Sequence, residues 1–182
     1  MFMKKSIDLK KFYHTSFPTE AALLTVKDKD KTNVITVAWH CTISKKPPLF
    51  GVSVAPQRHS HKLINESKEF VINFMNYDFV EKIHFCGTNS GRNTDKISKI
   101  GLNLVNSKKI STKAIKESYA CLECKLFDKI KLGDHTFFVG EIVNALIDNE
   151  SFSNEILDTD KMKPCYYIGD KIYTNFNSKK EF

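Results

Sequence analysis

The chain has 182 residues, of which 41% are hydrophobic and 27% charged, and its formal net charge is +7. This composition is typical of a soluble globular protein with a substantial core, and no apolar run reaches the ~20 residues that cross a bilayer. The positive charge suits an anionic partner or a lysine-rich surface, but no nucleic-acid-binding motif and no secretory signal is present, so we expect a cytoplasmic protein that binds neither membrane nor nucleic acid.

Segments with alternating or β-branched residues predict strands along most of the chain. These predicted strands cover residues 21–26, 33–39, 48–55, 69–75, 120–127 and 135–147. The linker KDKDKT between the first two predicts a hairpin turn. Residues 166–176 predict a second hairpin, with Gly169 and Asp170 at its turn.

Three short helices are predicted between the strands. The first covers 60–67 with Ser60 as its N-cap, and the second covers 76–87 and ends at Gly87. The third lies within 93–101 and ends at Gly101. No repeat or linker divides the chain, so we expect one domain over residues 1–182. Its fold class is all-β, an antiparallel barrel with helical insertions.

Two predicted strands each have a bulky face and a small face, because side chains alternate along a strand. The bulky faces, expected to fill the barrel, carry Ile35, Val37 and Trp39 on one strand and Phe50, Val52 and Val54 on the other. The small faces carry Thr36, Ala38 and His40, and Gly51, Ser53 and Ala55. They predict a shelf for a flat ligand, a surface beneath a partner subunit, or bare sheet facing solvent.

Basic and hydroxyl side chains cluster where the third predicted strand gives way to a helix. Arg58, His59, Ser60, His61 and Lys62 follow one another there. A helix N-terminus with a hydroxyl and a guanidinium makes a phosphate site. The alternative is a capped helix with a basic first turn, although basic residues at that end oppose the helix dipole.

Two further segments offer weaker candidates. The loop CGTNSGRNTDKI brings Ser90, Arg92 and Lys96 into a flexible cationic stretch that suits a phosphate, but many such loops bind nothing. His135 stands at the start of a long strand, where it either contacts a ligand or makes a structural hydrogen bond.

The five cysteines are dispersed, and only Cys121 and Cys124 are close in sequence. A strand places their side chains on opposite faces, whereas a redox pair needs a helix N-terminus and a zinc site needs a second pair. We therefore expect free thiols and no metal site.

Four segments, in this order, resemble the flavin reductase-like family of FMN-binding split barrels. They are NVITVAWHCTISKKPPLFGVSV, RHSHKLINESKEFVINF, CGTNSGRNTDKISKIGL and LECKLFDKIKLGDHTFFVGEIV. The resemblance runs from about residue 15 to about residue 175 and is nearest to the flavoredoxin branch. It implies a six-stranded Greek-key barrel, a homodimer, and FMN held near the subunit interface.

The resemblance also implies roles for individual residues. Asn33 and Trp39 would contact the flavin, Ser60 with Arg58 would hold its phosphate, and Lys96 would reach FMN. His135, the expected catalytic residue, would lie near the flavin ring or the nicotinamide, and Tyr166 or Tyr167 would pack on the ring. The full expected cofactor-binding set is Asn33, Thr36, Ala38, Trp39, His40, Ser53, Arg58, Ser60, Ser90, Arg92, Lys96 and Tyr167.

The expected function is flavin or ferric reduction, in which NADH or NADPH passes a hydride to flavin N5. The chain shows no catalytic triad or carboxylate pair, which agrees with a reaction carried by the cofactor. One alternative is an electron carrier that keeps FMN bound and receives electrons from a redox protein partner. A weaker alternative is a basic β-barrel that binds nucleic acid. The sequence does not distinguish NADH from NADPH or identify the final acceptor.

Overall fold

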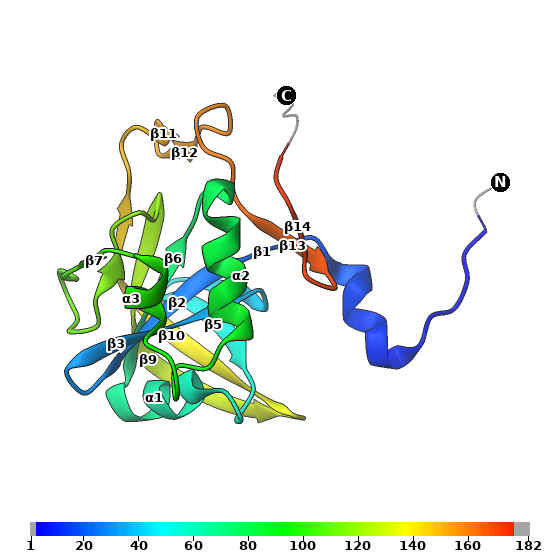
Figure 1. The fold of residues 1–182 in the computed structure, drawn as a ribbon, viewed down its shortest axis with the longest axis horizontal. Helices are drawn as coiled ribbons and strands as arrows, with labels where there is room; N and C mark the ends of the chain where they lie inside the picture. The colour runs from blue at the N-terminus through cyan, green and yellow to red at the C-terminus, as the bar shows by residue number, and fades with distance from the viewer. Residues whose placement is uncertain (1–2, 177–182) are drawn as a thin grey trace.

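The computed structural model describes residues 3–176, and its centre is one antiparallel sheet of seven strands (Figure 1). The strands are β2 (Ala22–Asp28), β3 (Lys31–Val37), β4 (His40–Lys45), β5 (Pro48–Val54), β6 (Glu69–Phe74), β9 (Ala120–Leu132) and β10 (His135–Ile147). Their order across the sheet is β3-β2-β6-β9-β10-β5-β4.

The sheet is curled into a barrel. Its two edge strands, β3 and β4, are consecutive in the chain with only Ala38 and Trp39 between them, so the two edges must meet. The Ser53 amide donates a hydrogen bond of 2.8 Å to the Trp39 carbonyl across this junction. β6 follows β5 in the chain but lies beyond β9 and β10, as in a Greek key. The predicted all-β barrel is therefore confirmed, with seven strands because the bend at residues 38–39 separates β3 from β4.

The remaining elements lie around the barrel. The helices are α1 (His59–Ser67), α2 (Val80–Thr88) and α3 (Lys96–Ile100), with 3-10 turns η1 (Leu9–Ser16) and η2 (Tyr77–Phe79). The short strands are β1 (Thr19–Glu20), β7 (Leu104–Val105), β8 (Ala114–Ile115), β11 (Phe152–Ser153), β12 (Ile156–Leu157), β13 (Tyr166–Gly169) and β14 (Ile172–Thr174). In Figure 1 the N-terminal segment with η1 extends away from the barrel.

Two apolar clusters hold the fold together. The first fills the barrel with Phe70, Phe138 and Ile72, and Leu63 and Ile64 of α1 pack against it. A second cluster joins the outer face of β2 and β3 to the helices that cover it and includes Leu23, Val34, Met75, Ile83 and Cys86. The first cluster holds α1 against the barrel and the second holds α2. Burial of apolar area therefore fixes the positions of both helices and of the loops next to them.

The predicted elements agree with the structure in most places. The strand predicted at 135–147 matches β10, and both predicted hairpins are present. The turn of the second lies at Asp170 and Lys171, both with positive φ, one residue later than the predicted Gly169 and Asp170, because Gly169 still pairs with Ile172. β4 was not predicted, because HCTISK lacks bulky apolar residues and is mostly exposed. β9 continues to Leu132 because it pairs with β10 along its whole length, which local sequence does not reveal.

The helix ends differ from the prediction in two places. α1 begins at His59 with Arg58 at the N-cap, so Ser60 is inside the helix and does not cap it. Gly87 is also inside its helix, since α2 runs to Thr88 and Asn89 follows as the C-cap. The third predicted end is confirmed, because Gly101 ends α3 with φ +61°.

The predicted faces are correct up to Ala38 and wrong beyond it. Val37 and Val52 point into the barrel as expected. Trp39, however, is partly exposed, while His40 stacks on Phe50 with ring centroids 5.5 Å apart. The bend between β3 and β4 interrupts the alternation, so the faces predicted for Trp39 and His40 are exchanged.

Cys121 and Cys124 lie on opposite faces of β9, as predicted. Cys124 packs in the barrel and Cys121 packs against Val71 and Ala114 outside it. Burial raises the pKa of the Cys121 thiol to about 11 and that of Cys124 to about 12, so both remain protonated thiols. Within residues 3–176 all five cysteines are free and no helix has the length and apolar character to cross a membrane.

Candidate functional site

A cavity of about 160 Å³ lies where β3, the start of α1 and the loop between α2 and α3 meet. We call it the cationic cavity. It is lined by Asn33, Ile35, Gln57, Arg58, His59, Ser60, Gly87, Thr88, Asn89, Ser90, Gly91, Arg92 and Lys96.

The electrostatics of the cationic cavity favour an anion. Arg58, Arg92 and Lys96 contribute three positive charges, and no carboxylate is among the lining residues that the structure describes. The N-cap of α1 makes no side-chain hydrogen bond to the helix N–H groups. A cationic wall beside uncapped N–H groups at a helix start is the arrangement that binds phosphate in proteins.

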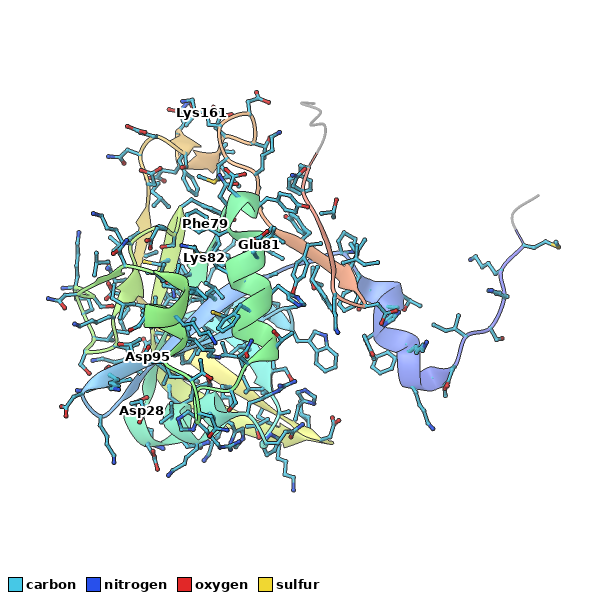
Figure 2. The ribbon with its side chains drawn as sticks, in the orientation of Figure 1. Asp28, Phe79, Glu81, Lys82, Asp95 and Lys161 are labelled. Atoms are coloured by element: carbon cyan, nitrogen blue, oxygen red, sulfur yellow. The ribbon has the colours of Figure 1, made fainter. Side chains whose placement is uncertain are left out.

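Two carboxylates line the neighbouring hollow, which shares Asn33, Gly91, Arg92 and Lys96 with the cationic cavity. Asp28 and Asp95, both labelled in Figure 2, line this hollow together with Lys31. The Asp28 carboxylate contacts His59 Nε2 at 3.0 Å. Asp28 is thus engaged by His59, and Asp95 caps α3 by accepting from the Ser98 amide, while neither lines the cationic cavity.

Close packing fixes the shape of the cationic cavity. The Asn33 side-chain amide donates to Ser60 Oγ at 2.7 Å, and Ser60 is buried. A Cβ on Gly91 would lie 1.8 Å from Asn33 Oδ1, so the loop can approach β3 this closely only with glycine there. The Arg92 guanidinium donates to the Gln57 carbonyl at 2.9 Å and ties the loop to the turn before α1.

Lys96 supports the same loop from inside. The residue is 4% exposed, and Nζ donates to the carbonyls of Cys86 at 2.9 Å and Asn89 at 3.0 Å. Burial lowers the pKa of Lys96, the Cys86 thiol opposes that shift, and the Arg58 charge adds to it. Two of its three N–H donors are therefore committed to the protein.

A second cavity, of about 240 Å³, continues from the first along β3 and β5, and we call it the strand cavity. Its lining includes Thr36, Ala38, Trp39, Ser53, Ala55, Arg58 and His135. The rings of Trp39 and His135 lie 4.9 Å apart at its end. His135 Nδ1 lies 2.7 Å from the Asp134 carboxylate, so we assign the proton to Nδ1 and leave Nε2 as an acceptor.

A third cavity, of about 250 Å³, lies beneath the β13–β14 hairpin, and we call it the hairpin cavity. It shares Thr36, Ala38 and Arg58 with the strand cavity. Its other lining residues are Ala21, His84, Gly87, Thr88, Tyr167, Lys171 and Tyr173. Arg58 lines all three cavities, so they adjoin one another around this residue, and we refer to the three together as the groove.

Comparison with known families decides the classification. The sequence pattern that defines the flavin reductase like domain matches residues 13–174. The chain belongs to the flavin reductase-like family.

Relatives and solved structures agree with this membership. An uncharacterised protein of Archaeoglobus fulgidus is 40% identical over 67% of this chain and 69% of its own length. The flavoredoxin of Desulfovibrio vulgaris superimposes with a TM-score of 0.89 and 25% identity, covering 99% of this chain and 97% of that one. An FMN-binding protein from Thermus thermophilus, solved with p-hydroxybenzaldehyde, has a TM-score of 0.84 and 25% identity, with 100% and 99% covered.

Most of the residues predicted from the family resemblance line this one groove. The cationic cavity is lined by Asn33, Arg58, Ser60, Ser90, Arg92 and Lys96. The strand cavity is lined by Thr36, Ala38, Trp39, Ser53 and His135, and the hairpin cavity by Tyr167. These residues come from five separate segments of the chain. Their convergence is a property of the fold that the order of motifs alone does not establish.

His40 and Tyr166 do not line these cavities. His40 points into the barrel, where Nε2 contacts the Glu20 carbonyl at 2.8 Å and the ring packs on Phe50. Tyr166 packs against Phe176 with ring centroids 4.7 Å apart. Of the two tyrosines that the resemblance offered for the groove, the structure therefore selects Tyr167.

Sequence reasoning missed His84, Lys171 and Tyr173, which line the hairpin cavity. His84 sits in the middle of α2, where nothing in the surrounding residues distinguishes it from an ordinary surface histidine. Tyr173 belongs to the hairpin predicted at 166–176, but it pairs with Tyr167 only across a register shift that the predicted turn does not reveal. Only the contact between α2 and that hairpin reveals the three together.

Proposed function

We propose that the protein binds FMN and is an oxidoreductase that uses it. The observation that carries this proposal is the carboxylate-free cationic cavity, with three cations and the uncapped start of α1, joined to a shelf of small residues. A phosphate monoester suits the cavity, and the Thr36–Ala38 shelf suits a flat ring. The Thermus thermophilus neighbour, described as an FMN-binding protein, supports the same assignment.

The proposed cofactor contacts follow the groove. Arg58, Ser60, Ser90 and Arg92 hold the phosphate, and Lys96 keeps the 86–92 loop in the shape that the phosphate needs. Trp39, Ser53 and His135 border the ring, with Thr36 and Ala38 beneath it. The Thr36 hydroxyl donates to the Ile83 carbonyl, so Thr36 acts as packing surface.

When bound, FMN supplies hydride and electron-transfer chemistry. We propose NADH or NADPH as the hydride donor and flavin or ferric iron as the acceptor. His135 is the residue that we place beside the reacting atoms. Its Nε2 acceptor and its contact with Trp39 make it suited to orient a nicotinamide carboxamide or a flavin edge.

A flavoredoxin-type electron carrier is the second candidate. The Desulfovibrio vulgaris flavoredoxin supports it, because that protein superimposes over nearly the whole chain. In this case a redox protein partner, and not a nicotinamide, would reduce the bound FMN.

We also propose a homodimer with the cofactor near its interface. α2 and α3 cover the outer face of β3, whereas exposed apolar side chains stand on β4 and β9, namely Ile43, Phe127, Ile130 and Leu132. Trp39 and His135 lie beside these strands at the end of the strand cavity. A second copy covering this face would close that end of the groove.

One purification separates the candidates. The protein should be yellow, or should become so when FMN is added, and anaerobic NADH or NADPH should then bleach the flavin band. Bleaching that requires an added reductase protein would favour the carrier. A folded protein that fails to bind FMN would overturn both, and salt-sensitive binding to DNA or RNA would then favour the nucleic-acid alternative.

A further inference from the structure

The hairpin cavity is the branch of the groove that lies outside the flavin contacts proposed above, apart from the shared Thr36, Ala38 and Arg58. The strand cavity is the other branch, and the two adjoin at these shared residues. A flavin has one phosphate and one ring system, so a flavin anchored in the cationic cavity extends its ring into one branch only. The other branch is then available to a second molecule beside the ring.

The chemistry of the two branches differs. Apart from the shared Arg58, the strand cavity has His135 as its only titratable residue within the described chain. The hairpin cavity adds Lys171 and His84 and again has no carboxylate among its described lining residues. The isoalloxazine ring carries no phosphate or carboxylate, so the additional lysine and histidine of the hairpin cavity suit a different ligand.

Two tyrosine rings give the hairpin cavity an aromatic wall. Tyr167 and Tyr173 face each other across the β13–β14 pair, with ring centroids 5.2 Å apart. Tyrosine faces bind planar aromatic molecules by stacking, at low cost in side-chain entropy. The cavity therefore joins a stacking surface to a cationic rim.

His84 is fixed against this wall. Its Nδ1 lies 3.3 Å from the Tyr173 hydroxyl, and the two rings meet edge to face. Burial raises the pKa of Tyr173 to about 12, so the phenol stays protonated at neutral pH. We assign the phenol as the donor to Nδ1, which leaves the proton of a neutral imidazole on Nε2, where it can donate to an anion.

We infer that the hairpin cavity binds the second reactant of the flavoprotein, and that this reactant is a planar aromatic molecule bearing a carboxylate or a phosphate. Its ring stacks on Tyr167, and its anionic group faces Lys171 and His84. The inference rests on the proposed binding of FMN. Two sources share this chemistry: the phosphorylated adenosine half of a nicotinamide donor, and an aromatic acid that accepts electrons.

The test uses the FMN-loaded full-length protein without any reductant. AMP, benzoate and neutral benzamide are titrated separately, and the shift of the flavin absorbance band gives each dissociation constant. Lys171→Gln removes the charge of the hairpin turn. Lys29→Gln is the matched control, because Lys29 is also an exposed hairpin-turn lysine with positive φ, at 55° compared with 68° for Lys171.

We expect AMP or benzoate to bind at least about tenfold more tightly than benzamide, since a charge-assisted contact is worth about 1.5 kcal/mol or more. Lys171→Gln should weaken the binding of the anionic probe about tenfold and leave FMN affinity unchanged. Lys29→Gln should have the same affinities as the unsubstituted protein. Preference for AMP identifies the nucleotide donor, and preference for benzoate identifies an aromatic acid.

Equal binding of benzoate, AMP and benzamide would overturn the inference, as would anion binding that Lys171→Gln leaves unchanged. A loss of FMN affinity in Lys171→Gln would also overturn it, because the flavin itself would then occupy the hairpin cavity. Each of these results leaves the proposed FMN binding intact. A protein that never takes up FMN fails at the loading step, before any probe is added.

Discussion

Lys96 carries a positive charge into the interior of the loop that joins α2 to α3. The family resemblance implies that Lys96 reaches FMN. In the structure two backbone carbonyls, those of Cys86 and Asn89, take two of its hydrogen-bond donors. Lys96 is therefore a positioning residue first, although it also lines the cationic cavity.

Lys96→Met should destabilise the apoprotein as well as weaken FMN binding. The substitution leaves the two buried carbonyls without their donor, at a cost of about 2 kcal/mol in the free energy of unfolding. Urea denaturation of the apoprotein measures this cost. If Lys96 served the phosphate alone, the midpoint would not move and only the FMN dissociation constant would rise.

His40 gives the protein a pH-dependent stability. Burial lowers the pKa of His40 below its usual 6.5, while its bond to the Glu20 carbonyl opposes the shift. The unfolded chain therefore takes up the proton first, and stability falls as pH decreases from about 6.5 toward the lowered folded pKa. Above pH 6.5 His40 is neutral in the folded and the unfolded protein, so its full contribution to the free energy of unfolding is present.

The difference between the unsubstituted protein and His40→Gln isolates this contribution. Stability of the unsubstituted protein should fall more steeply between pH 7 and pH 5, as measured by urea denaturation of the apoprotein. Parallel curves for the two proteins would contradict the burial of a neutral His40. FMN affinity at pH 7.5 should be similar in both, because His40 points into the barrel.

At the scale of elements, the sequence predicts the strands, turns and helix starts whose signals lie in residues close together in the chain. The hairpins and the cationic start of α1 were found because turn residues and charge runs are local signals. β4 was missed because its strand character comes from pairing with β5, and the exchange of Trp39 and His40 was missed because a bend reset the alternation. The hairpin cavity was missed because α2 and the β13–β14 hairpin are distant in the chain.

The loop between α2 and α3 approaches β3 so closely that one glycine sets its path. Gly91→Ala would place a methyl group against Asn33 Oδ1, so we expect the loop to shift and FMN to bind at least tenfold more weakly. The measurement is quenching of flavin fluorescence during titration of the apoprotein.

Gly101→Ala is the control for this element. Gly101 has φ +61° and no heavy atom within 4 Å of its added Cβ. The substitution should cost about 1 kcal/mol of stability through backbone strain while FMN affinity stays unchanged. Equal FMN affinities for the two variants would contradict the role given to Gly91.

At the scale of the whole molecule, the barrel joins a groove to an uncovered apolar face. Ile130 stands on that face, 46% exposed, on the part of β9 that projects with β10. If a second copy covers the face, Ile130→Glu places a charge in the interface and should convert the dimer to a folded monomer. Light scattering coupled to size-exclusion chromatography measures the mass.

Ile156→Glu is the matched control, because Ile156 is 73% exposed but lies on the separate β11–β12 pair. It should leave the mass unchanged. A monomeric unsubstituted protein, or a dimer that tolerates Ile130→Glu, would contradict the proposed interface.

We propose above that the cationic cavity holds the phosphate of FMN. The most direct test of this role is calorimetric titration of the apoprotein with FMN and with riboflavin, which differ only in that phosphate. We predict that riboflavin binds roughly a hundredfold more weakly, since two charge-assisted contacts contribute about 1.5 kcal/mol each. Arg92→Gln should reduce the difference in affinity between FMN and riboflavin, because it weakens the binding of FMN alone. Equal affinities for FMN and riboflavin would contradict the assignment of this cavity.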